Sequence, residues 1–249
     1  MKKNIYIIAN WKMNFNVEES SVFMNKLLSV SNEISKNLKI IICPQHLLIS
    51  NLKNHSNNTN IFLGAQDCHY KEKGAFTGDS SIDLVKALNC KYVILGHSER
   101  RIFHHETSQV VKKKVELVAS KSVEPILCIG EKLKHRVSKN YIDVILKQLD
   151  ESLPNGIKKI IIAYEPIWSI GSGETPTTQN IEEVAQSIYN FLTNYRKSID
   201  NPKILYGGSV NKDNASAICK IKNINGCLIG GASLIIDEFK EIIRKVNFN

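Results

Sequence analysis

Polar clusters follow short apolar runs at several points along this chain. Asn10 and Lys12 follow the first run, and His97 and Glu99 follow a later one in the segment GHSERR. A fixed ammonium can meet an anionic substrate, and the dipole of a helix starting behind His97 would disfavour the imidazolium. Taken alone, either residue has an ordinary interpretation as a surface lysine or as a core or surface histidine.

A third cluster is the segment AYEPIWSIGSGETPT, in which Glu165 ends an apolar run. Pro166 and Pro176 would stiffen the two ends of the following segment, while Gly171 and Gly173 would let backbone amides approach a ligand. These features predict a lid beside a carboxylate. The competing interpretation is a common Gly/Pro turn beside an ion-paired glutamate.

Paired glycines follow the last two apolar runs, in YGGS at 206–209 and GGAS at 230–233. Such pairs expose N–H groups, and amides at a helix N-terminus bind anions. One pair could serve a turn or tight packing, whereas two pairs at the ends of consecutive strands predict a phosphate site.

Eight short apolar runs are candidate strands, and segments of helical periodicity such as 17–30, 108–120 and 180–198 lie between them. Each run is continuously apolar rather than alternating, which is typical of parallel strands buried on both faces. No linker divides the chain, so we predict one domain over 1–249: a single closed (β/α)8 barrel of eight parallel strands, with its site at the strands' C-terminal ends. A dinucleotide-binding sheet is disfavoured because the first turn, ANWKMN, has no glycine. The eight runs are IYIIA, KIIIC, NIFLG, KYVILG, PILCIG, KIIIAY, KILYG and GCLIG.

The chain carries 33 Lys and Arg against 24 Asp and Glu, a net charge of +9. The excess is scattered, which favours a solvated surface over a nucleic-acid site. Six cysteines show no CxxC pair or metal-ligand spacing, so reduced thiols, a cytoplasmic location and no metal are expected. Lys12 interrupts the first apolar run, and no run approaches the ~18 residues of a membrane span, so neither a secretory leader nor a membrane partner is expected.

Six segments, in order along nearly the whole chain, resemble the signature segments of triosephosphate isomerases: ANWKMN, GHSERR, CIGE, AYEPIWSIG, YGGSV and IGGASL. The resemblance implies an intramolecular aldose–ketose isomerase. Such an enzyme interconverts D-glyceraldehyde 3-phosphate and dihydroxyacetone phosphate through an enediolate, in glycolysis and gluconeogenesis. The reaction is redox-neutral, so no cofactor is expected.

By the same resemblance, Glu165 is the general base that moves the proton between neighbouring carbons. His97, held neutral, is the electrophile that donates to the carbonyl and enediolate oxygens. Lys12 counters the phosphate and the developing oxyanion, Asn10 orients them, and Glu99 steadies the lysine.

The resemblance also implies that the phosphate lies against backbone amides and that a closing lid desolvates Glu165. The phosphate-binding residues are Gly171, Ser209, Gly230 and Gly231, and the supporting residues are Ile170, Leu228, Tyr206 and Thr77.

The segment 64–81 is long for a loop without secondary structure, which indicates a functional or interface element. In the resembled family this loop inserts into a second subunit, so a homodimer is expected. Thr77 would then approach Asn10, Lys12 and His97 of the other subunit. The alternative is a flexible surface loop.

Several positions depart from the family pattern: Asp67, Asp79, Asn225 and the stretch ETPT after the lid glycines. Asp67 and Asp79 bear on the dimer loop, and Glu174 and Pro176 bear on the lid hinge. Two other functions remain as alternatives: a different sugar-phosphate barrel enzyme, such as an epimerase or synthase, and an inactive barrel kept as a scaffold. Both predict loss of one or more of Lys12, His97 and Glu165, and all three are present.

Overall fold

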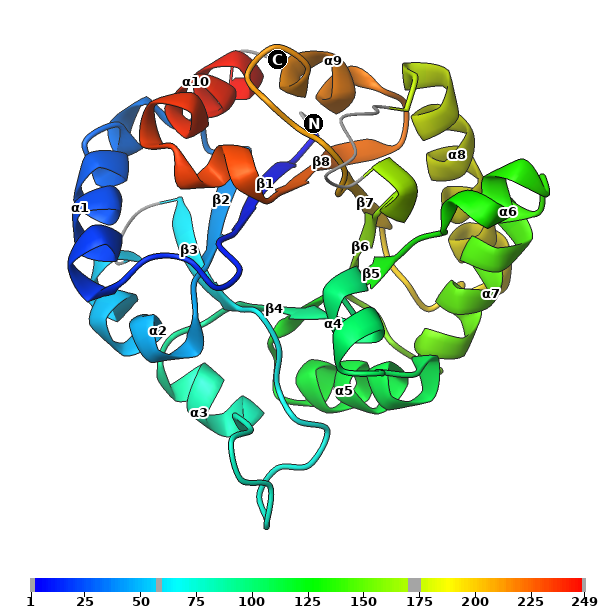
Figure 1. The fold of residues 1–249 in the computed structure, drawn as a ribbon, viewed down its shortest axis with the longest axis horizontal. Helices are drawn as coiled ribbons and strands as arrows, with labels where there is room; N and C mark the ends of the chain where they lie inside the picture. Colours follow the sequence, from blue (N-terminus) through cyan, green and yellow to red (C-terminus); the bar gives the residue numbers. More distant parts are fainter. Residues whose placement is uncertain (1–2, 57–59, 170–175, 248–249) are drawn as a thin grey trace.

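The computed structural model describes residues 3–56, 60–169 and 176–247. Eight parallel strands form a closed barrel in sequence order, with β1 paired to β8 (Figure 1). The predicted (β/α)8 barrel is confirmed. The strands are β1 (Ile5–Asn10), β2 (Leu38–Cys43), β3 (Ile61–Ala65), β4 (Tyr92–Leu95), β5 (Glu124–Ile129), β6 (Ile161–Tyr164), β7 (Lys203–Tyr206) and β8 (Ile224–Ile229).

Alternate residues of each strand pack on opposite sides of the barrel wall. In β1, Tyr6 and Ile8 belong to the cluster inside the barrel, whereas Ile7 and Ala9 pack against the surrounding helices. Both faces of the barrel wall are therefore shielded from water, which explains why the strands are continuously apolar in sequence. The inner cluster is closed by residues from neighbouring strands such as Ile94, Ile126, Ile161, Leu205 and Leu228.

Helices surround the barrel in a single outer ring (Figure 1). Their starts are set by capping side chains: Asn16 and Glu19 form a capping box at α1, and Thr107 caps α5. The helices are α1 (Val17–Leu28), α2 (His46–Leu52), α3 (Ile82–Ala87), α4 (Ser98–Phe103), α5 (Ser108–Ser120), α6 (Leu133–Val137), α7 (Tyr141–Ser152), α8 (Thr178–Tyr195), α9 (Ala215–Lys220) and α10 (Ile236–Asn247). Short 3-10 turns η1 (Ser31–Glu33), η2 (Lys53–Ser56), η3 (Ile167–Ser169) and η4 (Gly231–Leu234) complete the set.

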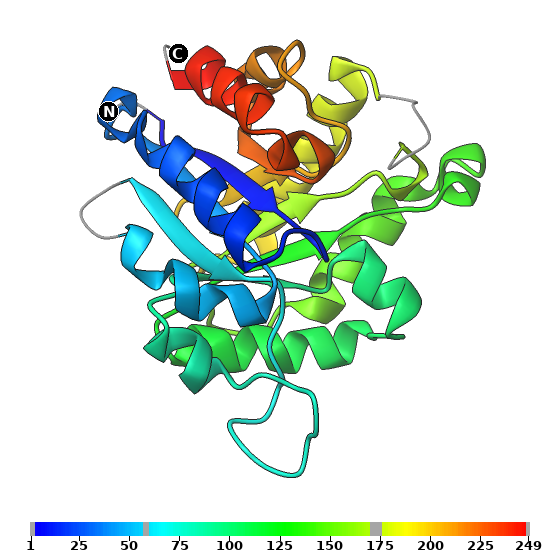
Figure 2. The ribbon, with the colours of Figure 1, turned by 60° about the vertical axis from the view of Figure 1, so that its left-hand side comes forward.

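The segment between β3 and α3 projects away from the barrel in both ribbon views (Figures 1 and 2). Its base is closed by the His69 amide, which donates to the Ser80 carbonyl at 2.9 Å. Within the loop, the rings of His69 and Phe76 lie 4.0 Å apart. The loop is therefore an ordered protrusion rather than part of the helical ring.

Across the described ranges, no helix is both long enough and apolar enough to cross a bilayer.

Candidate active site

A cavity of about 340 Å³ opens at the C-terminal ends of the strands. A larger cavity of about 630 Å³ lies at the opposite end of the barrel, beside the starts of β4 and β5. Its described lining includes none of the predicted site residues, so the smaller cavity is identified by its residues rather than by its size. Seven of the predicted site residues line the smaller cavity, together with neighbouring backbone: Asn10, Lys12, His97, Glu165, Ser209, Gly230 and Gly231. Leu228 also lines it, from the inner cluster of the barrel.

Glu165 directly follows β6 and is 2% exposed. Its amide donates to the Ile129 carbonyl at 2.8 Å, which extends the β5–β6 pairing by one residue. Gly130 permits this approach, because a Cβ there would lie 1.7 Å from the Glu165 carbonyl oxygen. The carboxylate is held at both oxygens: Oε1 lies 2.9 Å from His97 Nε2, and Oε2 accepts the Ser98 amide at 2.9 Å.

His97 occupies the N-cap position of α4, and its Nδ1 accepts the Glu99 amide at 3.2 Å. This bond assigns the proton of the neutral ring to Nε2, which then donates to Glu165. Burial acts to lower the pKa of His97, but the Glu165 carboxylate outweighs it and raises that pKa above its ordinary value. The Glu99 amide thus favours the predicted neutral ring, whereas contact with Glu165 favours the imidazolium.

Lys12 projects over the cavity from the loop after β1. Its backbone is in the left-handed region, with φ of 52°, a conformation that non-glycine residues adopt at a cost. Side chains hold it there: Asn10 Oδ1 accepts the Lys12 amide at 3.1 Å, and Gln66 donates to the Lys12 carbonyl at 2.8 Å. The ammonium lies 2.6 Å from Glu99 Oε1, the contact predicted between these residues.

The glycine pairs after β7 and β8 form the opposite wall. A Cβ at Gly208 would lie 2.2 Å from the Tyr206 hydroxyl, so only glycine fits. Among the described residues, no protein acceptor binds the amides of Gly208, Ser209 or Gly231. These free donors line the same cavity, as an anion site requires.

The segment that enters the predicted lid is anchored by Glu131, a residue that the sequence analysis did not single out. Glu131 is 1% exposed, and its Oε1 accepts from Trp168 Nε1 at 2.9 Å and from Arg136 Nε at 2.6 Å. Ser209 Oγ donates to the Ser169 carbonyl at 3.2 Å on the other side. Ile170, Gly171 and the rest of 170–175 lie outside the described residues.

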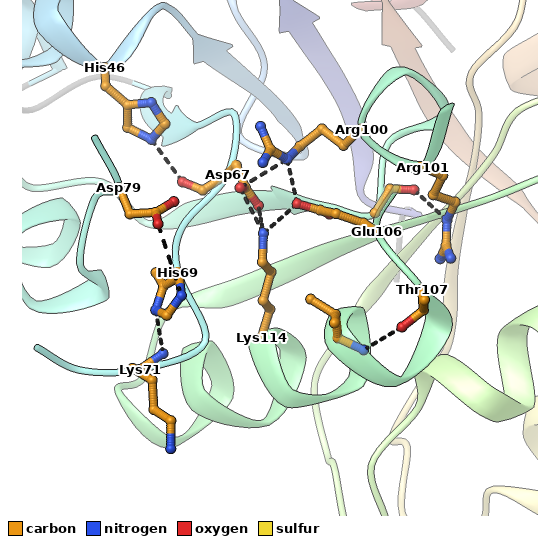
Figure 3. Close-up of polar contacts among 12 residues, drawn as sticks. His46, Asp67, His69, Lys71, Asp79, Arg100, Arg101, Glu106, Thr107 and Lys114 are labelled. Carbon is orange, nitrogen blue, oxygen red and sulfur yellow. Dashed lines mark hydrogen bonds and ion pairs between the residues drawn. The ribbon is translucent and has the colours of Figure 1, made fainter. Parts of the chain in front are cut away.

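A second charged cluster, also missed from sequence, joins Arg100 of α4 and Lys114 of α5 to Asp67 (Figure 3). Lys114 Nζ contacts both oxygens of Asp67, at 2.8 and 2.7 Å, and Glu106 Oε1 at 2.6 Å. Arg100 Nε bridges the same carboxylates at 2.9 and 2.7 Å. We call Asp67, Arg100, Glu106 and Lys114 the clamp. It ties the root of the projecting loop to α4 and α5.

The two carboxylates of the clamp have pKa values shifted in opposite directions. Burial raises the pKa of Asp67 despite Lys114. Burial also acts to raise the pKa of Glu106, but hydrogen bonds from Lys114 and Arg100 prevail and lower it. The two carboxylates therefore lose their charge at different pH values, and Glu106 stays ionised to a lower pH than Asp67.

Other predicted positions have simpler surroundings. Tyr206 is fully buried, and its hydroxyl has no hydrogen-bond partner within the part of the chain that is described. Thr77 is exposed on the projecting loop and does not line this chain's own cavity. Asp79 lies 4.0 Å from His69, and Asn225 accepts the Ile204 amide at 3.1 Å.

The described residues contain no group of three His, Cys, Asp or Glu side chains suited to a metal ion.

Comparison with known proteins gives one family. The family model for triosephosphate isomerase matches residues 5–246. The triosephosphate isomerase of Bradyrhizobium diazoefficiens is 38% identical over 242 residues, with 96% of each chain covered. The Wolbachia enzyme (subspecies Brugia malayi) is 40% identical over 241 residues, covering 96% of this chain and 97% of its own. The crystal structure of the Bartonella henselae triosephosphate isomerase superposes with a TM-score of 0.87 at 34% identity, covering 99% of this chain and 100% of the other. The chain therefore belongs to the triosephosphate isomerase family.

Proposed function

We propose that Glu165, His97 and Lys12 perform the reaction of this family, the interconversion of D-glyceraldehyde 3-phosphate and dihydroxyacetone phosphate. The observation that carries the assignment is the buried Glu165 carboxylate, 2.9 Å from His97 in a cavity that also receives an ammonium and free backbone amides. No redox change accompanies the reaction, so no cofactor is required.

Glu165 is the general base. It takes the proton from the carbon beside the carbonyl and returns it to the neighbouring carbon, so that an enediolate forms and collapses. Both carboxylate oxygens are bound here, Oε1 by His97 and Oε2 by the Ser98 amide. Substrate must therefore displace the His97 contact before the proton moves.

Displacement of the His97–Glu165 contact by the substrate frees the His97 ring to act on the substrate. Once Nε2 is released from Glu165, it can donate its proton in a hydrogen bond to the substrate oxygen on which charge develops. The Glu99 amide at Nδ1 favours a neutral ring, which is the form proposed to act. Lys12 adds a positive charge at the same oxygen and at the phosphate, and Asn10 holds its backbone.

The phosphate is proposed to lie against the amides of Ser209, Gly230 and Gly231, with Gly171 joining from the lid. Binding of this remote group supplies free energy for positioning the reacting carbons. Closure of the lid, with Ile170 facing Leu228, would remove water from Glu165 and protect the enediolate.

A coupled isomerase assay tests the assignment. Glu165→Gln is expected to lower kcat by at least about 10³-fold, because general-base catalysis is lost while shape is kept. Glu116→Gln, at an exposed carboxylate remote from the cavity, is the matched control and should keep wild-type turnover. A Glu165→Gln enzyme with near-normal turnover, free of wild-type contamination, would reject Glu165 as the base.

We also infer a homodimer in which the projecting loop inserts into the second subunit. Large apolar side chains are exposed near the cavity side of the barrel: Met13 is 86% exposed and Leu47 91% exposed, and Phe76 on the loop is partly exposed. Covering such residues favours association. Thr77 would then reach Asn10, Lys12 and His97 of the other subunit. Light scattering should give twice the 28.1 kDa chain mass, and a stable, active monomer would contradict the inference.

A cytoplasmic location and one domain over residues 1–249 complete the proposal. All six cysteines are free and buried, as a reducing compartment permits. Cell fractionation with a cytoplasmic marker tests the location, and a single cooperative unfolding transition tests the single domain.

A further inference from the structure

Two of the six buried cysteines lie in contact. Cys219 is on α9 and Cys227 on β8, and their sulfurs are 3.9 Å apart. Within the described ranges, no other two cysteine sulfurs are hydrogen-bonded to each other. Neither cysteine lines the catalytic cavity, so their contact is not explained by the catalytic assignment.

The local backbone keeps the two side chains facing each other. Cys227 belongs to the outer layer between strands and helices, whereas Leu228 next to it points into the barrel. The chain turns back between α9 and β8 through Asn223, which has a φ of 65°. A disulfide requires the sulfurs to approach from 3.9 Å to about 2.05 Å.

The two thiols differ in reactivity. The hydrogen-bonding contact with Cys227 lowers the pKa of Cys219, and Lys3 adds to that effect, although burial opposes both. The same contact and burial raise the pKa of Cys227. Cys219 is also 6% exposed, whereas Cys227 is fully buried. Although both thiols are buried, Cys219 has the greater exposure and the lowered pKa, so a small oxidant should react there before Cys227.

We propose that Cys219 and Cys227 form a reversible oxidative modification site, in which a hydroperoxide converts the pair to an intrachain disulfide. The Cys219 thiolate attacks one peroxide oxygen, the O–O bond breaks, and Cys219 becomes a sulfenic acid; the other oxygen leaves as hydroxide, or as alkoxide from an organic hydroperoxide, and takes up the proton that the Cys219 thiol released. The Cys227 sulfur then attacks the Cys219 sulfur and forms the S–S bond. The Cys227 proton leaves with the hydroxyl as water. The two thiols lose two electrons in total, and the peroxide takes them up.

Peptide mapping without reduction tests the proposal directly. The folded protein is treated with hydrogen peroxide, alkylated and digested with trypsin. Cleavage after Lys220 and Lys222 separates Cys219, in peptide 213–220, from Cys227, in peptide 223–240. The expected product is these two peptides joined, two hydrogens lighter than their sum. The two thiols should disappear in equal amounts and return with dithiothreitol, while the other four cysteines stay alkylated.

Three variants control the experiment. Cys219→Ser and Cys227→Ser should each abolish the linked peptide, whereas Cys90→Ser, at another buried thiol, should leave it unchanged. Circular dichroism of the treated wild type confirms that the fold persists. If the two peptides are recovered unlinked, whether their thiols are untouched or over-oxidised to sulfinic acid, the proposal is overturned. Linkage of either cysteine to a different partner overturns it equally.

Discussion

Residues of α4 take part in two charged clusters of similar composition. In the cavity, Glu165 pairs with a histidine that can lose its charge, and Lys12 has one carboxylate partner among the described residues, Glu99. In the clamp, two carboxylates are joined to two permanent cations, and Lys114 contacts both carboxylates.

The difference lies in whether a substrate can replace the protein partners of each charge. In the clamp each charged group contacts a permanent charge of opposite sign, and the side chains of Asp67, Glu106 and Lys114 are buried, although Glu106 Oε2 has no hydrogen-bond partner among the described residues. Removing one partner there would leave a buried charge unpaired. In the cavity the contacts are few and exchangeable, so a substrate can take the place of a protein partner. A reactive cluster is therefore recognised by contacts that a substrate can replace.

The largest expected effect comes from removing the Lys12 ammonium from the cavity. Lys12→Met should lower kcat/KM by about 10³-fold, because no second ammonium lines the cavity among the residues that the structure describes. Steady-state kinetics with glyceraldehyde 3-phosphate measures the loss, and thermal unfolding should change little. Lys159→Met, at an exposed lysine at the other end of the barrel, is the control. Normal efficiency in Lys12→Met would place the essential cation elsewhere.

Breaking the clamp should instead affect stability. Lys114→Met leaves Asp67 and Glu106 buried with Arg100 alone, and loss of one partner of a buried ion pair costs about 3 kcal/mol or more in unfolding free energy. Urea unfolding measures the change, and folded enzyme at low temperature should keep kcat within a few-fold of wild type. Adding Asp67→Asn removes one stranded charge and should recover part of the loss. If the double variant is no more stable than Lys114→Met, Asp67 is not charged in the clamp.

A third prediction sharpens the cavity side of the comparison. In Glu165→Gln the pKa of His97 should fall relative to the wild type, because burial and the Lys12 ammonium still lower it, the largest raising contribution is gone, and only the Glu99 carboxylate still raises it. Measurement by NMR titration of the ring protons gives the pKa in both proteins. The raised pKa of His97 also means that its pairing stabilises the fold below the unfolded pKa near 6.5 and loses that effect as pH rises through the folded value. Identical titration curves in the two proteins would show that Glu165 does not set the charge of His97.

The strands and the cavity residues that directly follow them could be predicted from the sequence. Strands buried on both faces are visible as continuous apolar runs, and closure of eight of them places the polar residues after each strand around one cavity. Asn10, His97 and Glu165 were found in this way because their position along a strand fixes their position in space.

The clamp could not be predicted, because its contacts join residues far apart in sequence, such as Asp67 and Lys114, through the tertiary fold. Asp67 was noticed only as a departure from the family pattern. Gln66 holds the Lys12 backbone, and Glu131 holds the Trp168 side chain. Both residues were missed because no local sequence motif predicts such contacts. An acidic residue two positions after a buried strand, as Glu131 is in CIGE, was the available signal.

The smallest expected effect tests whether the phosphate wall works through backbone rather than side chains. Ser209→Ala removes the hydroxyl that donates to the Ser169 carbonyl at 3.2 Å but keeps the Ser209 amide. A neutral hydrogen bond of this kind contributes about 1 kcal/mol, so KM should rise only a few-fold and kcat should stay close to wild type. Ser209→Pro removes the amide itself and should raise KM far more, and because proline also constrains the backbone, circular dichroism must show that the fold is retained. If Ser209→Ala is as damaging as Ser209→Pro, the hydroxyl binds phosphate directly, and the wall is built from side chains as the clamp is.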